Sequence, residues 1–393
     1  MSNICFTPLV KNNFLNSDYK FKNCNVNKLF GKFFFLFILF FLSNTSTLLS
    51  QWSSIKTISQ NLNLNSIYAV TPGHIFIATD SATILKSSEG GFNWTRTSGV
   101  GGISQSNNLY TIFFIDSVNG WAAGTKGSAV KTTNSGNTWT PMTMADGNIT
   151  IKQIRFVDSL NGWAVGNSGK IQITTDGGSS WSIQHTFQSV QSINSIYFMP
   201  EDAQTIWVAG NSGFIAKSTN EGINWINLNS GTNNDLLCIK FGDRNIGWAV
   251  GKSGTILLTV NGGINWISVP SPIIGAGDIN SILVSSDGSA IIACSNGRLY
   301  ETYNFGNTWV DVEPIFNQSI NSIFFLPLLL YSVTNGGNIG ITYLARTRDE
   351  ICYDAYNLCL NKCNKGQTEC IESCNRMFID CLRKSSKINL IYY

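Results

Sequence analysis

Charged residues and histidine are scarce in this chain, and their scarcity excludes several classes of protein. Only 12% of the 393 residues are charged, and only two are His. A disordered chain would combine low hydrophobicity with high net charge, whereas 43% of these residues are hydrophobic. Residues 51–345 carry 13 Lys and Arg against 16 Asp and Glu, a net charge of −3. We therefore expect no nucleic-acid partner, which would require a basic surface.

A long apolar run is also missing. The most apolar run, residues 33–42 (FFFLFILFFL), has ten residues, whereas a helix that spans a membrane needs about 20. Lys28 and Lys32 precede it and small or polar residues follow, as in a secretory signal. Residues 1–50 are thus predicted to be a cleaved signal peptide, an uncleaved signal anchor over 33–49, or a plastid-type targeting sequence. We expect a secreted or lumenal protein, which contacts a membrane only if the anchor is kept.

Four Asn-x-Ser/Thr sequons fit an exported chain. Two of them are the predicted glycosylation sites: Asn148 and Asn317.

The chain is rich in Gly and Trp, and it contains an internal repeat. Six turn phrases end in Trp at spacings of 45, 42, 44, 41 and 43 residues. About 18 residues before four of these Trp stands a second phrase, written NGWAAG, NGWAVG, TIWVAG or IGWAVG, and a strand-like alternating phrase precedes it. Four short strands in roughly 43 residues are the content of one β-propeller blade. The Trp side chains are then predicted to pack between blades.

The repeat count predicts seven blades. Six units are complete, and a seventh after Trp309 has three strand phrases but no fourth. Residues 51–55 (QWSSI), ahead of the first complete unit, resemble the missing strand. We predict an all-β, seven-bladed β-propeller over residues 51–345, in which the N-terminal strand closes the last blade and removes free sheet edges.

The turn phrase resembles the Asp-box, or BNR repeat, with the pattern Ser/Thr-x-Asp-x-Gly-x-x-Trp. The clearest copy is TDGGSSW at 175–181, and Asn or Glu replaces Asp176 in the other copies. Paired with NGWAVG across residues 51–345, it is most similar to the photosystem II assembly and stability factor family and to related secreted propellers. The resemblance implies box residues that are structural, a thylakoid-lumen address, and a protein client bound through a positive patch.

Six of the ten Cys are arranged symmetrically about Gly366. Their spacings of seven and four place them on one face of two helices that fold back on each other. Residues 346–393 are therefore predicted to form a small α-helical hairpin and tail, with a Zn site on two CxxxC pairs as the alternative. No His lies nearby, so we favour three nested disulfides: Cys352–Cys381, Cys359–Cys374 and Cys363–Cys370. Cys238 and Cys294, in strand phrases, are predicted to be buried free thiols.

No catalytic constellation is visible in the sequence. The few Arg of the propeller stand at unequal blade positions, including Arg155 and Arg244, and do not predict a sialidase-like cluster. Asp116, Asp158 and Asp243 recur at equivalent strand ends, which predicts turn caps rather than a pair of catalytic carboxylates. We expect a protein that is not an enzyme and holds no metal or cofactor, with a sialidase-like glycoside hydrolase as one alternative.

Basic residues recur at one turn of four blades. Propeller geometry predicts that these turns lie on one face, where they are either a weak basic binding ring or solvated turn residues. The four residues are Lys126, Lys170, Lys252 and Arg298. We predict a monomeric, secreted or lumenal scaffold that binds a protein or a glycan. A photosystem II assembly or stability factor-like role is the other alternative.

Overall fold

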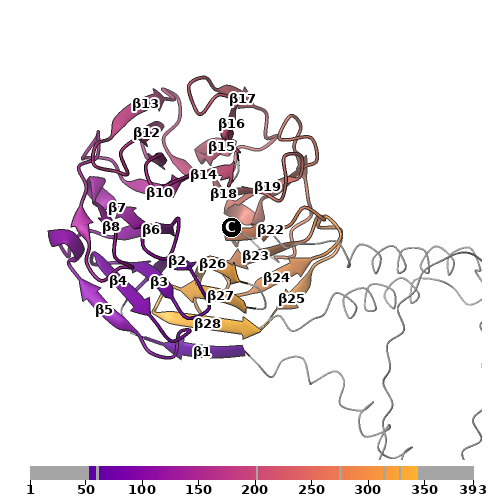
Figure 1. Ribbon diagram of the computed structural model, residues 1–393. Helices are drawn as coiled ribbons and strands as arrows, with labels where there is room; N and C mark the ends of the chain where they lie inside the picture. The colour runs from indigo at the N-terminus through magenta and orange to yellow at the C-terminus, as the bar shows by residue number, and fades with distance from the viewer. Residues whose placement is uncertain are drawn as a thin grey trace, which may run out of the picture. The chain divides into compact units, whose positions relative to one another are not determined.

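The computed structural model confirms the predicted propeller. The described residues form seven four-stranded antiparallel sheets arranged in a ring (Figure 1). They are residues 53–58, 62–200, 202–273, 277–312, 316–326 and 329–343. The predicted leader of residues 1–50 and the predicted cysteine hairpin, with its six Cys, lie outside these residues.

Blades 1 to 6 each use four strands that follow one another in the chain. Blades 1 to 3 are β2 (Leu64–Ala69), β3 (Ile75–Thr79), β4 (Thr83–Ser87) and β5 (Thr95–Ser98); β6 (Leu109–Phe114), β7 (Gly120–Gly124), β8 (Ala129–Thr132) and β9 (Thr140–Pro141); β10 (Ile151–Phe156), β11 (Gly162–Gly166), β12 (Lys170–Thr174) and β13 (Ser182–Thr186). Blades 4 to 6 are β14 (Ile193–Met199), β15 (Asp202–Gly210), β16 (Ile215–Ser218) and β17 (Ile226–Leu228); β18 (Leu236–Phe241), β19 (Gly247–Gly251), β20 (Ile256–Thr259) and β21 (Ile267–Ser268); β22 (Ile279–Val284), β23 (Ala290–Cys294), β24 (Leu299–Thr302) and β25 (Val310–Val312).

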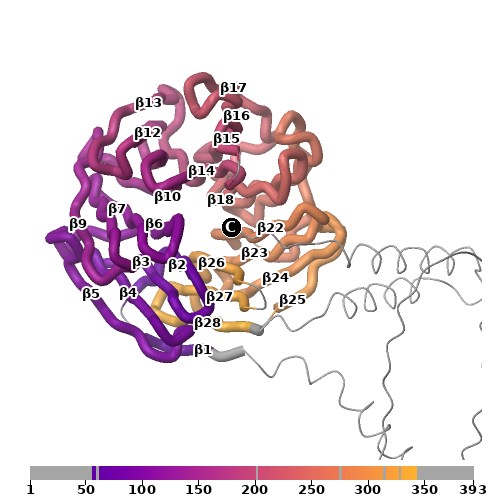
Figure 2. Tube along the Cα trace, in the orientation of Figure 1, coloured from indigo at the N-terminus to yellow at the C-terminus, as the bar shows by residue number. Residues whose placement is uncertain are grey.

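Blade 7 joins the two ends of the propeller, as predicted. Its first three strands are β26 (Ile320–Leu326), β27 (Leu329–Thr334) and β28 (Asn338–Tyr343), and β1 (Ser53–Thr57) pairs antiparallel with β28 as the fourth. In Figure 2 the two ends of the described chain lie side by side in this blade. The first strand of each blade contacts the first strands of both neighbouring blades, so the seven first strands close a ring around the axis.

Helices have almost no part in the described structure. They are four 3-10 turns: η1 (Val100–Gly102), η2 (Thr125–Gly127), η3 (Asn211–Gly213) and η4 (Lys252–Gly254). Among the described residues, no helix has the length and apolar character needed to cross a membrane.

Aromatic stacking between blades explains the repeated Trp. Trp121 of blade 2 stacks on Phe156 of blade 3 with ring centroids 3.7 Å apart, and the box residue Trp181 meets Phe156 edge-on. Trp207 and Phe241 repeat the stack between blades 4 and 5 at 4.0 Å. Such pairs contribute about 0.5–1.5 kcal/mol each beyond the area they bury. The Trp repeat is therefore the packing that holds neighbouring blades together.

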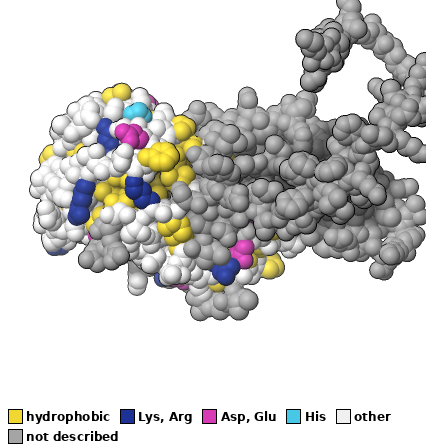
Figure 3. Space-filling model, turned by 90° about the horizontal axis from the view of Figure 1, so that it is seen from below, with side chains coloured by type: hydrophobic (Ala, Val, Ile, Leu, Met, Phe, Trp, Pro, Cys, Tyr) yellow, Lys and Arg dark blue, Asp and Glu magenta, His cyan; other side chains and the backbone are white. Residues whose placement is uncertain are grey.

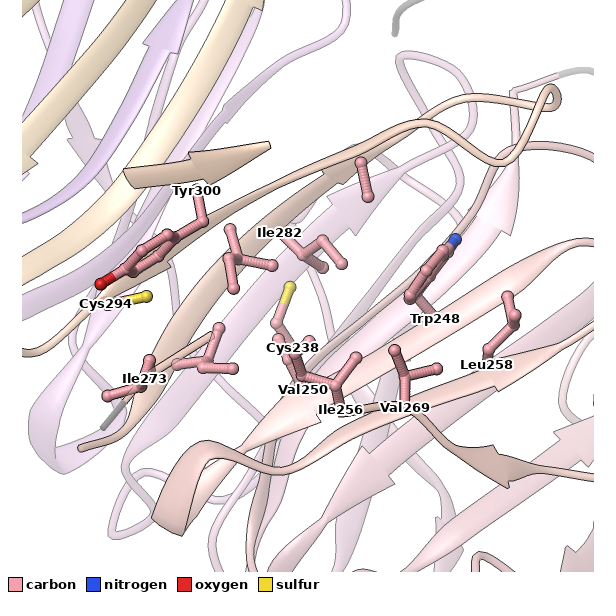
Figure 4. Packing of buried hydrophobic residues seen from close by; sticks show 13 residues of the cluster. Cys238, Trp248, Val250, Ile256, Leu258, Val269, Ile273, Ile282, Cys294 and Tyr300 are labelled. Carbon is pink, nitrogen blue, oxygen red and sulfur yellow. The ribbon is translucent and has the colours of Figure 1, made fainter. Parts of the chain in front are cut away.

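The seam between blades 5 and 6 is packed differently (Figure 4). Trp248 meets Trp309 edge-on at 6.3 Å, and aliphatic side chains such as Ile282 fill much of the remaining core. Cys238 and Cys294 belong to this cluster. Both are buried and free, as predicted.

The Asp-box acts as a turn cap. The Asp176 carboxylate accepts the backbone N–H and the hydroxyl of Ser180, and these bonds lower the pKa of Asp176 to about 2. Asn accepts the equivalent backbone N–H in four other boxes, at Asn134, Asn220, Asn261 and Asn304. In the first box Glu89 differs, because its longer side chain accepts the Asn93 amide instead.

Candidate binding site at the propeller axis

The fifth residue of each first strand occupies an equivalent position in the ring of seven first strands. In blade 3, Arg155 pairs directly with Trp163 of the second strand, and in blade 5 Lys240 pairs with Trp248. A register shift after the first residue recurs in the first strand of every blade, so it sets the same alternation in all seven. We call the seven fifth residues the axial ring: Tyr68, Phe113, Arg155, Tyr197, Lys240, Leu283 and Phe324.

A layer of side-chain hydrogen bonds next to the axial ring holds the first strands together. In five blades the third residue of the first strand accepts the backbone N–H of the next blade's fourth residue. The Thr111 hydroxyl accepts from Ile154 at 3.4 Å, and the Ser195 hydroxyl accepts from Ile239 at 3.2 Å. Cys238 occupies this position in blade 5. These bonds fix neighbouring strands relative to each other, and therefore fix the axial side chains.

Aromatic rings form an unbroken wall along part of the axial ring. The Tyr68 ring lies 4.7 Å from that of Phe324 and 5.4 Å from that of Phe113, centroid to centroid. The Arg155 guanidinium lies 5.3 Å from the centre of the Phe113 ring and 5.8 Å from that of Tyr197. The Tyr197 hydroxyl donates to the Phe241 carbonyl at 2.7 Å, which anchors this wall. Arg155 is thus held by cation–π contacts on both sides.

Positive charge on the first strands has no negative counterpart there. All seven first strands are described, and they contain Lys152, Arg155 and Lys240 but neither Asp nor Glu. Burial lowers the pKa of Lys240, and the Arg155 charge lowers it further although the Cys238 thiol acts in the opposite direction. Burial also lowers the pKa of Lys152, whose ammonium lies 4.8 Å from the Tyr110 ring centre. The first strands therefore carry only positive charge in a net-acidic propeller.

Three of the four basic residues predicted at turns are paired with carboxylates. Each of the four follows the second strand of its blade. Lys170 bonds to Asp146 and lowers the pKa of that carboxyl, while Lys252 pairs with Asp278 at 2.7 Å and Arg298 with Asp311 at 2.9 Å. Lys126 is exposed, in η2. On the side of the propeller in Figure 3, charged side chains are few and scattered.

Other predicted sites have mixed outcomes. Asn148 and Asn317 are both exposed, in the segments that lead into β10 and β26, so sugar transfer there stays a prediction. The aspartates at strand ends are turn caps, as predicted: Asp116, Asp158 and Asp243 each accept two backbone N–H groups of their own turns. Within the described ranges, no three His, Cys, Asp or Glu side chains are grouped to hold a metal.

The axial ring is not evident in the sequence alone. Arg155 and Arg244 have similar places in the sequence, but the structure puts Arg244 in a turn, where it pairs with Asp202 at 3.2 Å. One feature of the sequence could have revealed this ring. When the seven first strands are aligned, their only charged residues are Lys152, Arg155 and Lys240.

Comparison with known proteins now separates the possible families. A family model described as photosynthesis system II assembly factor YCF48 matches residues 39–133 and 131–367. The chain belongs to this family. The match spans the whole described propeller and confirms the resemblance drawn from the Asp-box and NGWAVG phrases. No curated protein matches the chain.

Solved structures of YCF48 have the same fold. "YCF48 bound to D1 peptide" is 16% identical with a TM-score of 0.63, over 75% of this chain and 97% of that chain. YCF48 from Cyanidioschyzon merolae is 17% identical with a TM-score of 0.62, over 75% and 100%. The WD40 propeller of Doa1 also matches, at 10% identity and a TM-score of 0.59, over 74% and 95%. At such identities these likenesses show the fold alone.

Proposed function

We propose that this protein is a photosystem II assembly factor-like scaffold without catalytic activity, which binds a segment of a protein client. The observation that carries the proposal is the YCF48 family match across the whole propeller. A rigid ring of seven blades is suited to present a fixed binding surface, and the YCF48 structure with a D1 peptide shows that a relative binds a polypeptide. The photosystem II assembly factor-like alternative drawn from the sequence is thus preferred to a general secreted scaffold.

The axis supports binding rather than glycoside hydrolysis. Glycosidases of most families need two carboxylates about 5–10 Å apart. The first strands offer no carboxylate, and the aspartates at their ends cap turns. Aromatic rings beside unpaired cations are instead typical of surfaces that bind peptides.

The compartment that we propose is a lumen. The apolar run at 33–42 predicts export across a membrane. A thylakoid or endomembrane lumen is consistent with both this run and the family match. An exported scaffold for a protein or glycan unrelated to photosystem II is the second candidate, favoured by the Lys-flanked run and the six C-terminal Cys.

Two measurements test the proposal. Fluorescence anisotropy with a labelled synthetic D1 peptide should show saturable binding to the full chain, with a scrambled peptide as control. Affinity capture from the protein's own cells should recover photosystem II assembly intermediates. Failure of both would contradict the assembly-factor role, and capture of a glycoprotein released by free glycan would support the second candidate.

A further inference from the structure

The two faces of the propeller carry different turns. Strand direction alternates along each sheet, so the turn between the first and second strands lies at the same end of a blade as the Asp-box turn between the third and fourth. Backbone bonds join the two turns, as from Ser135 to the Val118 carbonyl and from Gly177 to the Leu160 carbonyl. Equivalent bonds between successive first strands show that the blades point the same way. All these turns therefore lie on one face, which we call the box face.

Exposed large apolar side chains are unevenly distributed between the faces. Among the described residues, they occur in the turns of the box face and in the fourth strands, but not in the turns and connections of the opposite face. Each of blades 1 to 6 places at least one in a box-face turn: Phe92, Val118, Leu160, Ile223, Ile264 and Phe305. Isolated apolar residues on a surface need no explanation, whereas a set that recurs on one face marks an interaction site.

The three most exposed of these residues share one position, two residues before the box Trp. Phe92 is 74% exposed, Ile264 67% and Ile223 66%. Three other boxes have a polar residue at this position: Asn137, Ser179 and Asn307. The turn therefore does not require an apolar side chain there, and the fold does not bury the three that are present.

The arrangement of these apolar residues fits a flat surface. They surround the ring, with at least one from each of six blades, so a bound peptide would contact only one sector of them. A lipid bilayer is flat over the width of a propeller, and the apolar side chains of a docked protein enter the boundary between its headgroups and acyl chains. One bilayer surface can therefore contact all six blades at once.

The chain also enters the propeller at the box face. β1 is the fourth strand of blade 7 and β28 is the third, so Ser53 and its partner Thr342 lie at the box-face end of the sheet. The apolar run at 33–42 ends eleven residues before Ser53, a stretch of chain that reaches at most about 40 Å. The segment predicted to direct the chain across a membrane is thus joined to the face that carries the apolar turns.

We propose that the box face docks on a lipid bilayer, with Phe92, Ile223 and Ile264 entering the headgroup boundary. Residues 51–345 carry a net charge of −3, so we expect lipids without net charge to bind the propeller at least as well as anionic lipids. The opposite face, which carries the basic turns, then points away from the membrane. The inference does not rest on the proposed client.

Hydrogen exchange of the full chain, with and without phosphatidylcholine vesicles, tests the docking. We expect exchange to slow in the box-face turns and to stay unchanged in the turns of the opposite face. The triple variant Phe92→Asn, Ile223→Asn, Ile264→Asn should need about 100-fold more lipid for the same slowing, because each inserted side chain contributes roughly fivefold to binding. The control Lys126→Ser changes an exposed turn of the opposite face to the residue at the equivalent position of blade 3, and it should behave as wild type.

Because this readout is local to the turns, it separates docking of the box face from any attachment through residues 1–50. Equal slowing in wild type and the triple variant, or none in wild type, overturns the inference. Two other results also overturn it: slowing confined to the opposite face with phosphatidylglycerol, which assigns lipid binding to the basic turns, and concentration-dependent slowing of the box face without vesicles, which assigns that face to a second copy of the chain. If the triple variant does not fold, Ile264→Asn replaces it, with an expected shift of about fivefold.

Discussion

Two groups of basic residues in the propeller differ in what faces them. At the turns after the second strands, Lys170, Lys252 and Arg298 each bond to an aspartate nearby. On the first strands, Arg155 and Lys240 meet aromatic rings or other cations, and no carboxylate. A turn can place an acid beside a base at little cost, since both remain near water. A first strand is less exposed to water, so a charge there is more costly. Cations on first strands are therefore more informative about function than cations at turns.

Removing the aromatic support of Arg155 should have the largest effect on stability. Tyr197→Ala deletes a buried ring beside the guanidinium, and we expect a loss of about 3–4 kcal/mol of unfolding free energy. Tyr197→Phe keeps the ring and loses the bond to the Phe241 carbonyl, at a cost of about 1 kcal/mol. Urea unfolding measures both. A similar cost for the two variants would show that the ring does not support the site.

Reversing one charge from each group should separate them in client binding. Lys240→Glu places a carboxylate against an acidic ligand, and we expect peptide affinity to fall by at least about 100-fold. Lys252→Glu, an exposed change at the turn, should alter it by less than about threefold at physiological salt. Anisotropy titrations measure both. Equal losses of affinity would mean that residues at the turns and on the first strands both contribute to peptide binding.

The pH dependence of stability should also distinguish the groups. The pKa of Lys240 is lower in the folded protein than its ordinary value of 10.5, so the unfolded state binds more protons between the two values. Stability should therefore rise as the pH increases through that window. Lys86, Lys152 and Lys217 act in the same direction, and comparison with Lys240→Met isolates the contribution of Lys240. Parallel curves for the two proteins would contradict this assignment.

Breaking a turn pair should have the smallest effect. Asp278→Asn removes the carboxylate that faces Lys252, whose side chain is 48% exposed. We expect a loss of about 0.5 kcal/mol or less, because exposed ion pairs contribute little. Chemical unfolding is the readout. A loss above about 2 kcal/mol would indicate that the turn pairs are structural elements comparable to the axis.

The fold was predictable from sequence because each blade repeats the same local chemistry. The Trp spacings mark the blade repeats, and Asn substitutes for Asp in the boxes because its amide oxygen accepts the same backbone N–H, as Asn220 does from Asn224. Closure by the N-terminal strand followed from counting strand phrases. Cys238 and Cys294 were predicted as buried thiols from their apolar neighbours.

The candidate site was not predictable in the same way. Arg155 and Lys240 are 85 residues apart, and each is one charge in an otherwise ordinary strand phrase. Only ring closure brings their strands around one axis, and only the repeated register shift gives both the same axial position. The basic turns were visible in the sequence, but their aspartate partners come from segments before the next blade or from outer strands, as with Asp278 and Asp311.

Binding of a labelled D1 peptide to the wild-type chain, Lys240→Met and Lys252→Met is the most direct test of the central claim, that the cations of the first strands bind a protein client. At fixed ionic strength, we predict saturable binding that Lys240→Met weakens at least tenfold and that Lys252→Met leaves nearly unchanged. Equal affinity for all three proteins, or a loss confined to Lys252→Met, would contradict the claim.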